Sequence, residues 1–319
     1  MDTLERIQRE ASLMGCTCLV QEPMSKHTTF RIGGPADLLV TAGTMGQLRG
    51  LVRLCRETET PVYLLGKGSN LLVSDEGIRG VVISLGGEFT SVSREGENGI
   101  RCGAGASLAS VCVFARENRL SGLEFAWGIP GSAGGAAYMN AGAYGGEMKE
   151  VLVSCDHMTL TGETGSLQGE ELALGYRRSA YSGGDKIILF LHLSLTPGNP
   201  VDIGHKMEEL MTRRKDRQPY EMPSAGSVFK RPEGYYAGTL IEQCGLKGCQ
   251  IGGAQVSPKH AGFIVNTGGA TCRDVEALIE KIQETVLRET GVTLECEVRR
   301  AASCRTQAAA GSPRRQAAR

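Results

Sequence analysis

The chain has 319 residues, of which 41% are hydrophobic and 22% charged, close to the averages of soluble globular proteins. Its 35 Lys and Arg balance 35 Asp and Glu, so no net charge favours nucleic acid or an anionic membrane surface. Because no window holds the roughly 20 apolar residues that span a bilayer, we expect a cytoplasmic protein of two or three domains that binds neither nucleic acid nor membrane.

Cysteine and glycine are unusually frequent. The 11 cysteines form an odd number without CxxC pairs, a pattern typical of reduced, buried thiols, and we expect no metal site. The 44 glycines are about twice the usual share, and they cluster at 66–68, 122–146 and 245–253. Such clusters indicate places where the backbone turns with positive φ or approaches something closely.

The first part of the chain reads as a small β-α-β-β unit, for which we assign residues 1–85. Apolar residues recur at helical spacing in two segments and form short continuous runs in three others. We expect helices at 2–14 and 45–55 and strands at 37–41, 61–65 and 80–85.

The second part, residues 86–200, reads as another α+β unit. A short strand near residue 98 precedes a helix at 107–118, for which Ser107 is a plausible N-cap. The glycine-rich stretch follows, and two apolar strands fit 151–160 and 186–196. Pro197, Gly198, Asn199 and Pro200 then break the pattern and mark a boundary.

The third part, residues 201–302, begins with a charged helix. We expect helices at 202–216, 237–244 and 272–290 and strands at 262–266 and 292–298. The tail, residues 303–319, lacks periodicity and acidic residues, so we expect it to be disordered.

Two glycine-rich segments could bind an anion or a flat ligand. In LGKGSNLLVSD (65–75), glycines let backbone N–H groups converge on a diphosphate, although an ordinary turn explains the segment equally well. In WGIPGSAGGAAYMNAGAYGGEM (127–148), small residues allow a close approach, and Ser132 and Asn140 add polar groups; packing alone is the alternative. Neither segment has the spacing of a Walker A or dinucleotide fingerprint.

Several motifs together are specific where each alone is not. In order, they are HTTFRIGGPA (27–36), LGKGSNLLVSD (65–75), GIPGSAGGAAYMNAGAYGGE (128–147), GYRRS (175–179), PSAGSVFKRP (223–232) and LECEVR (294–299). Over roughly residues 28–299 the chain resembles the UDP-N-acetylenolpyruvoylglucosamine reductases, the MurB family. Only about 36 residues separate Arg177 from Arg213, so it resembles the shorter branch without the substrate-covering insertion.

The resemblance implies an α+β protein with a two-part FAD-binding unit of the vanillyl-alcohol-oxidase (PCMH) type, followed by a C-terminal α+β substrate domain. It further implies noncovalent FAD, NADPH as hydride donor, and reduction of a UDP-sugar enolpyruvyl group to give UDP-N-acetylmuramate for peptidoglycan. A monomer is favoured. The implied FAD contacts are Gly66, Lys67, Gly68, Ser69, Asn70, Leu71, Ile129, Pro130, Gly131, Ser132, Gly134, Gly135, Asn140, Gly142, Ala143 and Tyr144.

The resemblance also carries over three catalytic residues, Arg177, Ser227 and Glu297. Hydride addition to a vinyl ether bearing a carboxylate leaves negative charge on the substrate, for which Arg177 offers a permanent forked cation. Ser227 can supply the proton that quenches the carbanion, and Glu297 can donate a hydrogen bond or orient another donor. If the chain is extended here, Arg178 points away from the side that Arg177 faces.

Substrate contacts are assigned to Arg217, Gly226 and Lys230. Arg217 stands where relatives usually have Lys, which changes the bond geometry rather than the role. A lone histidine more often packs than catalyses, so His260 is left out of the catalytic set.

Two other functions stay open at this stage. One is a flavin oxidase of the same binding fold, which often attaches its flavin to His or Cys; neither residue occurs in 65–75 or 127–148. The other is a nucleotide-sugar binding protein without catalysis, against which the three carried-over residues argue.

Overall fold

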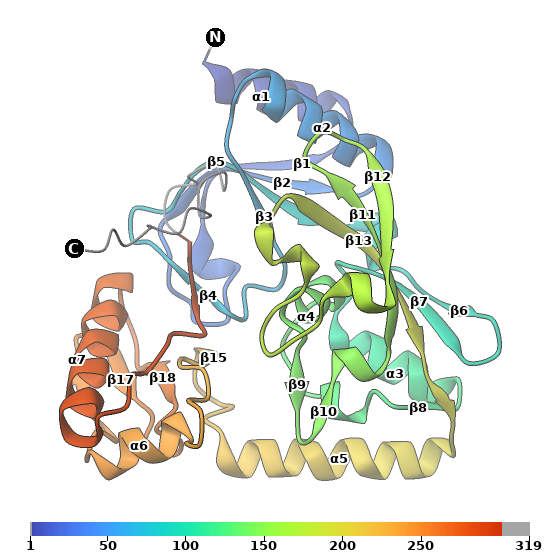
Figure 1. The fold of residues 1–319 in the computed structure, drawn as a ribbon. Helices are drawn as coiled ribbons and strands as arrows, with labels where there is room; N and C mark the ends of the chain where they lie inside the picture. The colour runs from blue at the N-terminus through green and yellow to red at the C-terminus, as the bar shows by residue number, and fades with distance from the viewer. Residues whose placement is uncertain (1, 302–319) are drawn as a thin grey trace, which may run out of the picture.

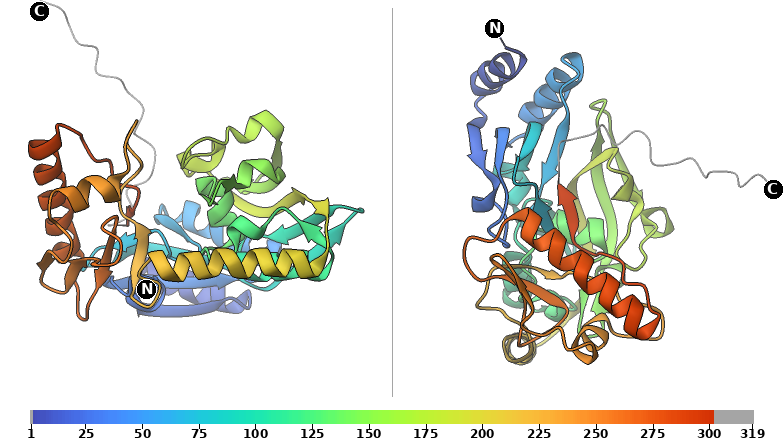
Figure 2. Two further views of the ribbon diagram at one scale, coloured as in Figure 1. Left: turned by 90° about the horizontal axis from the view of Figure 1, so that it is seen from below. Right: turned by 90° about the vertical axis from the view of Figure 1, so that its left-hand side faces the viewer.

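The structure is a computed structural model and describes residues 2–301. Three sheets of four or five strands follow one another along the chain, each built from its own stretch of sequence, and three two-stranded pairs accompany them (Figures 1 and 2). The predicted domain limits at 85, 200 and 302 stay a prediction, and the tail predicted to be disordered lies outside the described residues. Along residues 2–301 no helix has both the length and the apolar character of a membrane span.

The first sheet has the order β1-β2-β5-β3, with β1 antiparallel and the other strands parallel. Its core side packs against α1 and α2, and strands of the second sheet share the same apolar cluster. The predicted helices and the strands β2, β3 and β5 are confirmed. The bounds are α1 (Thr3–Leu13), β1 (Thr17–Pro23), β2 (Pro35–Ala42), α2 (Met45–Glu57), β3 (Val62–Leu65) and β5 (Ile78–Leu85).

Strand β1 was not predicted. It lies at the sheet edge, where Leu19 and Val20 are both exposed. Its buried and exposed positions do not alternate, so the period-2 pattern that marks a half-buried strand is missing.

The second sheet is antiparallel in the order β12-β11-β13-β7-β6. Five successive residues of β13, Ile187–Leu191, are buried, as its apolar run predicts. The bounds are β6 (Val92–Glu95), β7 (Gly99–Gly103), α3 (Leu108–Glu117), β8 (Leu120–Ser121), α4 (Ala133–Met139), β9 (Gly142–Ala143), β10 (Gly146–Glu147), β11 (Leu152–Thr159), β12 (Thr164–Gln168), β13 (Lys186–Ser194) and β14 (Thr196–Pro197).

Helix α5 (Pro200–Arg217) runs beneath the second unit and leads into the C-terminal part (Figures 1 and 2). Asn199 caps it by accepting a hydrogen bond from the Val201 N–H at 2.9 Å, and Pro200 fits the first turn because its missing N–H is not needed there. Ile203, Met207 and Leu210 face the protein interior.

The third sheet has the order β15-β18-β17-β16 and packs against α6 and α7 around a separate apolar core. Thr271 and Asp274 form a capping box at the start of α7, and Gly291 ends it with φ +72°. The bounds are β15 (Ser224–Ser227), α6 (Ala237–Gln243), β16 (Gln250–Ile251), β17 (Ala254–Val256), β18 (Phe263–Asn266) and α7 (Cys272–Thr290).

The strand predicted at 292–298 is wrong. This segment is extended but joins no ladder; its backbone bonds to the 228–230 loop, while Leu294 and Val298 pack into the third core. The last strand is instead β19 (Arg299–Ala301), which pairs in parallel with β4 (Leu71–Val73) of the first unit. The alternating apolar residues indicate extended chain correctly, but they do not identify its partner.

Candidate functional site

The two glycine-rich segments meet in space. A Cβ on Gly66 would lie 2.8 Å from the Ser132 Oγ, and one on Gly131 would lie 3.9 Å from the Ser69 Oγ. Gly68 has φ +62°, and a Cβ there would collide with the His27 carbonyl. Glycine at 66 therefore allows the close approach of the two segments, and glycine at 68 allows the first segment to pack on the backbone of residues 27 and 28.

The first segment presents a row of free donors. In the part of the chain that the structure describes, the backbone N–H groups of residues 66–70 donate to no protein group. Successive N–H groups without protein acceptors form the concavity that binds a phosphate. The segment therefore fits the diphosphate of a dinucleotide cofactor.

The second segment acts more as a scaffold than was predicted. Residues 133–139 form α4, which was missed because two glycines lower its helix propensity. Ser132 caps this helix and accepts a hydrogen bond from the Gly135 N–H at 3.2 Å. A Cβ on Gly134 would lie 2.7 Å from the Ala104 Cβ, so part of this small-residue pattern serves packing.

Asn140 differs from the prediction in the role of its side chain. It is buried with φ +43°, and its amide nitrogen donates to Glu147 Oε2 at 3.0 Å and to the Gly175 carbonyl at 3.2 Å. Its Oδ1 accepts from the Lys149 N–H at 2.9 Å. Both amide hydrogens are thus used by protein groups, so this amide ties the second segment to the GYRRS turn instead of donating to a ligand.

Arg177 lies in a tight turn, not in extended chain. Gly175 and Arg178 exchange backbone hydrogen bonds of 3.1 Å each, and Arg177 between them has φ +56°. The prediction that the two arginine side chains point apart assumed an extended chain, and that assumption is wrong. The two side chains still separate, because that of Arg178 folds back over Gly175 while that of Arg177 reaches Glu297.

Arg177 and Glu297 form a largely buried ion pair. Arg177 Nε donates to Glu297 Oε1 at 2.6 Å, with side chains 23% and 13% exposed. Burial raises the pKa of Glu297, whereas the charge and hydrogen bond of Arg177 and the charge of Lys230 lower it; the net direction is upward. Glu297 therefore holds a proton more readily than an ordinary carboxylate, although it lies beside a cation.

The backbone of Glu297 is held by both neighbouring segments. Its N–H donates to the Val228 carbonyl at 2.7 Å, and its carbonyl accepts from the Asn70 Nδ2 at 3.2 Å. The Arg299 N–H donates in turn to the Asn70 carbonyl at 3.0 Å. Asn70, predicted only as a cofactor contact, thus also positions Glu297.

Ser227 is connected to the Arg177–Glu297 pair by the backbone and not by its side chain. It ends β15 one residue before Val228, and its Oγ donates to the Phe229 carbonyl at 3.2 Å. Gly226, with φ +77°, precedes it and leaves open space where a side chain would be. Arg177 and Glu297 are in direct contact, and Ser227 immediately precedes Val228, whose carbonyl accepts the hydrogen bond from the Glu297 N–H.

The other predicted substrate residues are at the surface. Lys230 pairs with Glu295 at 2.9 Å, and Arg217 is exposed at the end of α5. Two further tyrosines were missed although they lie within the quoted motifs. The Tyr176 hydroxyl accepts from the Arg231 N–H at 2.9 Å, and the Arg299 guanidinium bonds to the Tyr138 hydroxyl and stacks 4.5 Å from its ring centroid.

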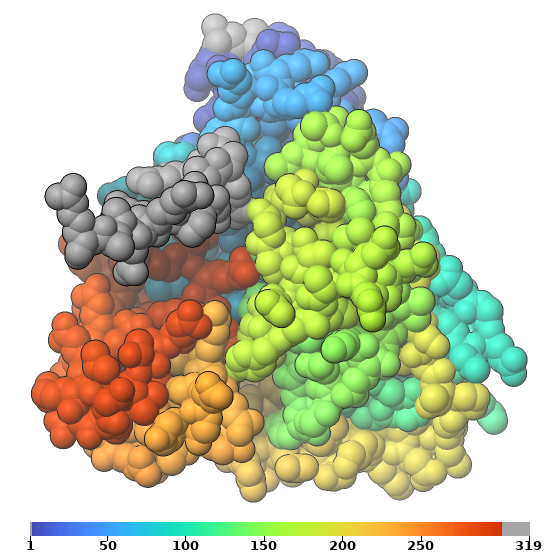
Figure 3. Space-filling model, in the orientation of Figure 1, coloured from blue at the N-terminus to red at the C-terminus, as the bar shows by residue number. Residues whose placement is uncertain are grey.

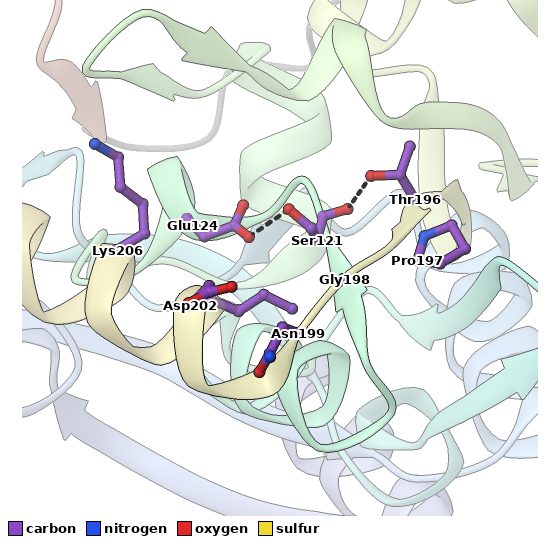
Figure 4. Close-up of a pocket in the computed structure, with 9 residues that line it drawn as sticks. Ser121, Glu124, Thr196, Pro197, Gly198, Asn199, Asp202 and Lys206 are labelled. Carbon is purple, nitrogen blue, oxygen red and sulfur yellow. Dashed lines mark hydrogen bonds between the residues drawn. The ribbon is translucent and has the colours of Figure 1, made fainter.

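A separate pocket of about 400 Å³ opens at the start of α5 (Figure 4). Glu124 points into this region and accepts hydrogen bonds from the Ser121 Oγ at 2.7 Å and the Gly122 N–H at 2.8 Å. Asp202 adds a second carboxylate, and none of the predicted site residues lines the pocket. Its two carboxylates outnumber the one ammonium in the lining, that of Lys206, so the pocket does not suit a diphosphate.

Two family models match the chain in succession. One, described as FAD binding domain, matches residues 36–167, and the other, described as UDP-N-acetylenolpyruvoylglucosamine reductase, C-terminal domain, matches residues 218–301. The UDP-N-acetylenolpyruvoylglucosamine reductase of Lachnoclostridium phytofermentans is 47% identical over 300 residues, which are 93% of this chain and 96% of the relative. The chain belongs to the UDP-N-acetylenolpyruvoylglucosamine reductase family.

Further relatives agree with this assignment. The reductase of Geobacillus thermodenitrificans is 50% identical over 281 residues, covering 88% of this chain and 92% of the relative. The crystal structure of the reductase (MurB) from Thermus caldophilus superposes with a TM-score of 0.78 at 38% identity, covering 90% of this chain and 99% of that one. The predicted α+β architecture, an FAD-binding part followed by the C-terminal domain of this reductase family, is confirmed.

Proposed function

We propose that this chain reduces the enolpyruvyl group of UDP-N-acetylenolpyruvoylglucosamine with FAD and NADPH and releases UDP-N-acetylmuramate for peptidoglycan synthesis. The observation that carries the proposal is the Arg177–Glu297 pair, which joins the FAD-binding part to the C-terminal domain. Asn70 connects the same glutamate to the row of free N–H groups at 66–70. A diphosphate site and a forked cation thus lie within one connected set of residues.

Residues 66–70 would hold the FAD diphosphate through their backbone N–H groups, with the second glycine segment packed behind them. When bound, FAD carries a hydride from NADPH to the unsaturated sugar. The two segments, 65–75 and 127–148, contain no His or Cys, so the proposal includes noncovalent attachment. Precipitation with acid should leave the yellow colour in the supernatant; flavin that stays in the washed pellet contradicts noncovalent attachment.

Arg177 stabilises the negative charge that develops on the substrate after hydride addition. Its planar guanidinium can hold an enolate or carboxylate at two points, and its Nε already donates to a carboxylate in this structure. Glu297, with its raised pKa, can keep a proton close to that charge. The pair therefore combines a permanent cation with an exchangeable proton.

Ser227 supplies the proton that ends the reaction. Its hydroxyl donates to the Phe229 carbonyl here, and rotation about χ1 would turn it toward a substrate carbanion. A hydroxyl is a weak acid, so backbone donors or Lys230 must stabilise the alkoxide that remains.

The test separates the two half-reactions under anaerobic conditions. NADPH should bleach the flavin of Ser227→Ala at close to the normal rate, whereas recolouring by the enolpyruvyl sugar should slow by about 10² to 10⁴, as expected for loss of a positioned general acid. Ser93→Ala, at an exposed serine of β6, serves as the control. Equal slowing of both half-reactions would remove Ser227 from the role of proton donor.

The same measurement on the wild-type chain decides between the proposal and its rivals. Recolouring by the sugar without oxygen supports the reductase, recolouring by oxygen alone supports a flavin oxidase, and binding without a colour change supports a binding protein. A cytoplasmic location, a monomeric state and a preference for NADPH over NADH are further parts of the proposal. Light scattering of the purified holoenzyme would test the monomer.

A further inference from the structure

His192 lies between two carboxylates on the second sheet. Its Nδ1 is 2.7 Å from Glu95 Oε2, and its Nε2 is 3.1 Å from Asp156 Oδ2. The histidine side chain is 20% exposed, whereas those of Glu95 and Asp156 are 46% and 37% exposed. Each ring nitrogen of this half-buried histidine therefore has an acidic partner of its own.

The two contacts together specify the charge of the ring. An ionised carboxylate only accepts hydrogen bonds, and a neutral imidazole has one N–H and one bare nitrogen. Both contacts are hydrogen bonds only when both nitrogens carry a proton, so the geometry requires an imidazolium. Burial lowers the pKa of His192, but the hydrogen bonds and charges of Glu95 and Asp156 raise it further, and the net direction is upward.

The three side chains come from different strands of the sheet. His192 is on β13 and Asp156 on the neighbouring β11, while Glu95 ends β6, which is separated from β13 by β7. The β6–β7 hairpin forms one edge of the sheet and projects from the body of the molecule (Figure 1). Strand β6 has a ladder partner on one side only, so the contact with His192 is an additional link from this edge to the interior of the sheet.

One further charge lies on the same face of the sheet. Arg101 of β7 is directly opposite His192 in the ladder, so both side chains point to this face. Its guanidinium carbon lies 3.6 Å from the ring centroid of Phe190, and it makes no ion pair with a carboxylate of residues 2–301. On β12 the residue opposite Asp156 is the uncharged Ser166. The neighbouring strands thus present two carboxylates and one cation to His192, which favours its protonated form.

We propose that His192 is a proton-dependent clamp of the second sheet. With both nitrogens protonated, it holds the β6–β7 hairpin through Glu95 and β11 through Asp156 at the same time. Loss of one proton leaves a bare nitrogen facing a carboxylate, so one of the two contacts becomes repulsive and its strand loses the link. The clamp therefore closes as the pH falls and opens as the pH rises, which makes the edge of this sheet looser at alkaline pH.

Nitrogen-15 NMR of the histidine rings in the holoenzyme tests the charge state directly. Both nitrogens of His192 should carry a proton at pH 6, and the midpoint of its titration should lie above the roughly 6.5 of an unperturbed histidine. Glu95→Gln and Asp156→Asn keep an acceptor oxygen but remove the charge, so each should lower this midpoint. A neutral His192 at pH 6, or a midpoint that neither substitution moves, would overturn the proposal.

Hydrogen exchange of the β6 amides tests whether the proton holds the hairpin. The variant His192→Gln is compared with the wild-type holoenzyme at each pH, so that the intrinsic exchange rate cancels, and His205→Gln, at an exposed histidine of α5, is the control. A pKa of His192 that is raised in the closed state makes the clamp complete below about pH 6.5 and abolishes it as the pH rises through the closed-state value.

At pH 6 the β6 amides of His192→Gln should therefore exchange about two- to fivefold faster than those of the wild type, as for the loss of a partly exposed ion pair. This ratio should approach one as the pH rises, and His205→Gln should match the wild type throughout. A ratio that stays constant between pH 6 and pH 9 would show that His192 supports the hairpin by packing alone, and the proposed clamp would be wrong.

Discussion

The C-terminal domain meets the two FAD-binding units in different ways. With the first unit it forms a parallel strand pair, β4 with β19, and the Asp75 carboxylate accepts from the N–H groups of Cys272 and Arg273 at 2.7 and 3.1 Å. We call this boundary the strand seam. With the second unit, no backbone–backbone hydrogen bond joins residues 86–200 to residues 218–301. We call this boundary, visible between the green and orange surfaces of Figure 3, the side-chain seam.

The two seams position the two members of the Arg177–Glu297 pair differently. Glu297 is fixed from the strand seam, through Asn70 and the adjacent β19, while Arg177 comes from the second unit and crosses the side-chain seam to meet it. Backbone ladders and helix caps resist displacement together, whereas individual side-chain contacts can break one at a time. The backbone of Glu297 is thus held across the strand seam, whereas only the side chain of Arg177 crosses the side-chain seam.

The largest effect should come from Arg177→Lys at the side-chain seam. The ammonium keeps the charge but loses the planar fork, so turnover should fall by at least about 100-fold, as when a single electrostatic donor is removed from an active site. Arg178→Lys, whose side chain lies over Gly175 instead, is the control. Near-normal turnover of Arg177→Lys would show that the pair is only structural.

Asp75→Ala tests the strand seam. It removes two hydrogen bonds at the start of α7 and should lower the free energy of unfolding by about 1–2 kcal/mol, as for loss of a helix N-cap, while turnover stays within about twofold. Urea unfolding of this variant and of Glu76→Ala, an exposed neighbour, would measure the difference. A loss of activity that exceeds the loss of stability would mean that the strand seam also transmits strain to Glu297.

Glu297→Gln tests which force dominates within the pair. Burial raises the pKa of Glu297 in the folded state above its value of about 4.3 in the unfolded chain. Proton binding to Glu297 therefore stabilises the fold fully below the unfolded pKa. This stabilisation is lost as the pH rises through the folded-state pKa. Gln does not titrate, so the variant should gain stability relative to wild type between pH 4 and 7. Urea midpoints across this range that show the opposite slope would mean that attraction to Arg177 outweighs burial.

The smallest effect is expected for Tyr176→Phe. The lost hydroxyl accepts one hydrogen bond from the Arg231 N–H at the half-exposed edge of the side-chain seam, so water can replace it at a cost below about 1 kcal/mol. Thermal unfolding compared with Asp75→Ala measures this directly. A larger loss for Tyr176→Phe would reverse the ranking of the two seams.

Much of the fold could be predicted because its elements carry local signals. Helices α2, α5 and α7 have regular apolar stripes and capping residues, and their predicted limits fall within about two residues of the observed ones. The stripe of α5 even includes Arg214, which follows Ile203, Met207 and Leu210 at helical spacing. Extending the buried face to that arginine would have indicated its burial from sequence.

The site itself depended on contacts that local pattern does not encode. Arg177 and Glu297 are 120 residues apart, and only the family motifs selected this glutamate among the carboxylates. The pairing of β19 with β4 could not be predicted either, because the two strands are far apart in the sequence. Helix α4 was missed because packing against Ala104 overrides the low helix propensity of its glycines. Tertiary context decided each of these cases.

The pairing of β4 with β19 has a consequence for biosynthesis. Residue 71 leaves the ribosome more than 200 residues before its partner, residue 299, an interval of about 10 to 50 seconds at usual elongation rates. Throughout that time the first glycine segment lacks its link to Glu297. A nascent or prematurely ended chain that stops before residue 297 therefore lacks the carboxylate and the strand together, so we expect incomplete products to be inactive.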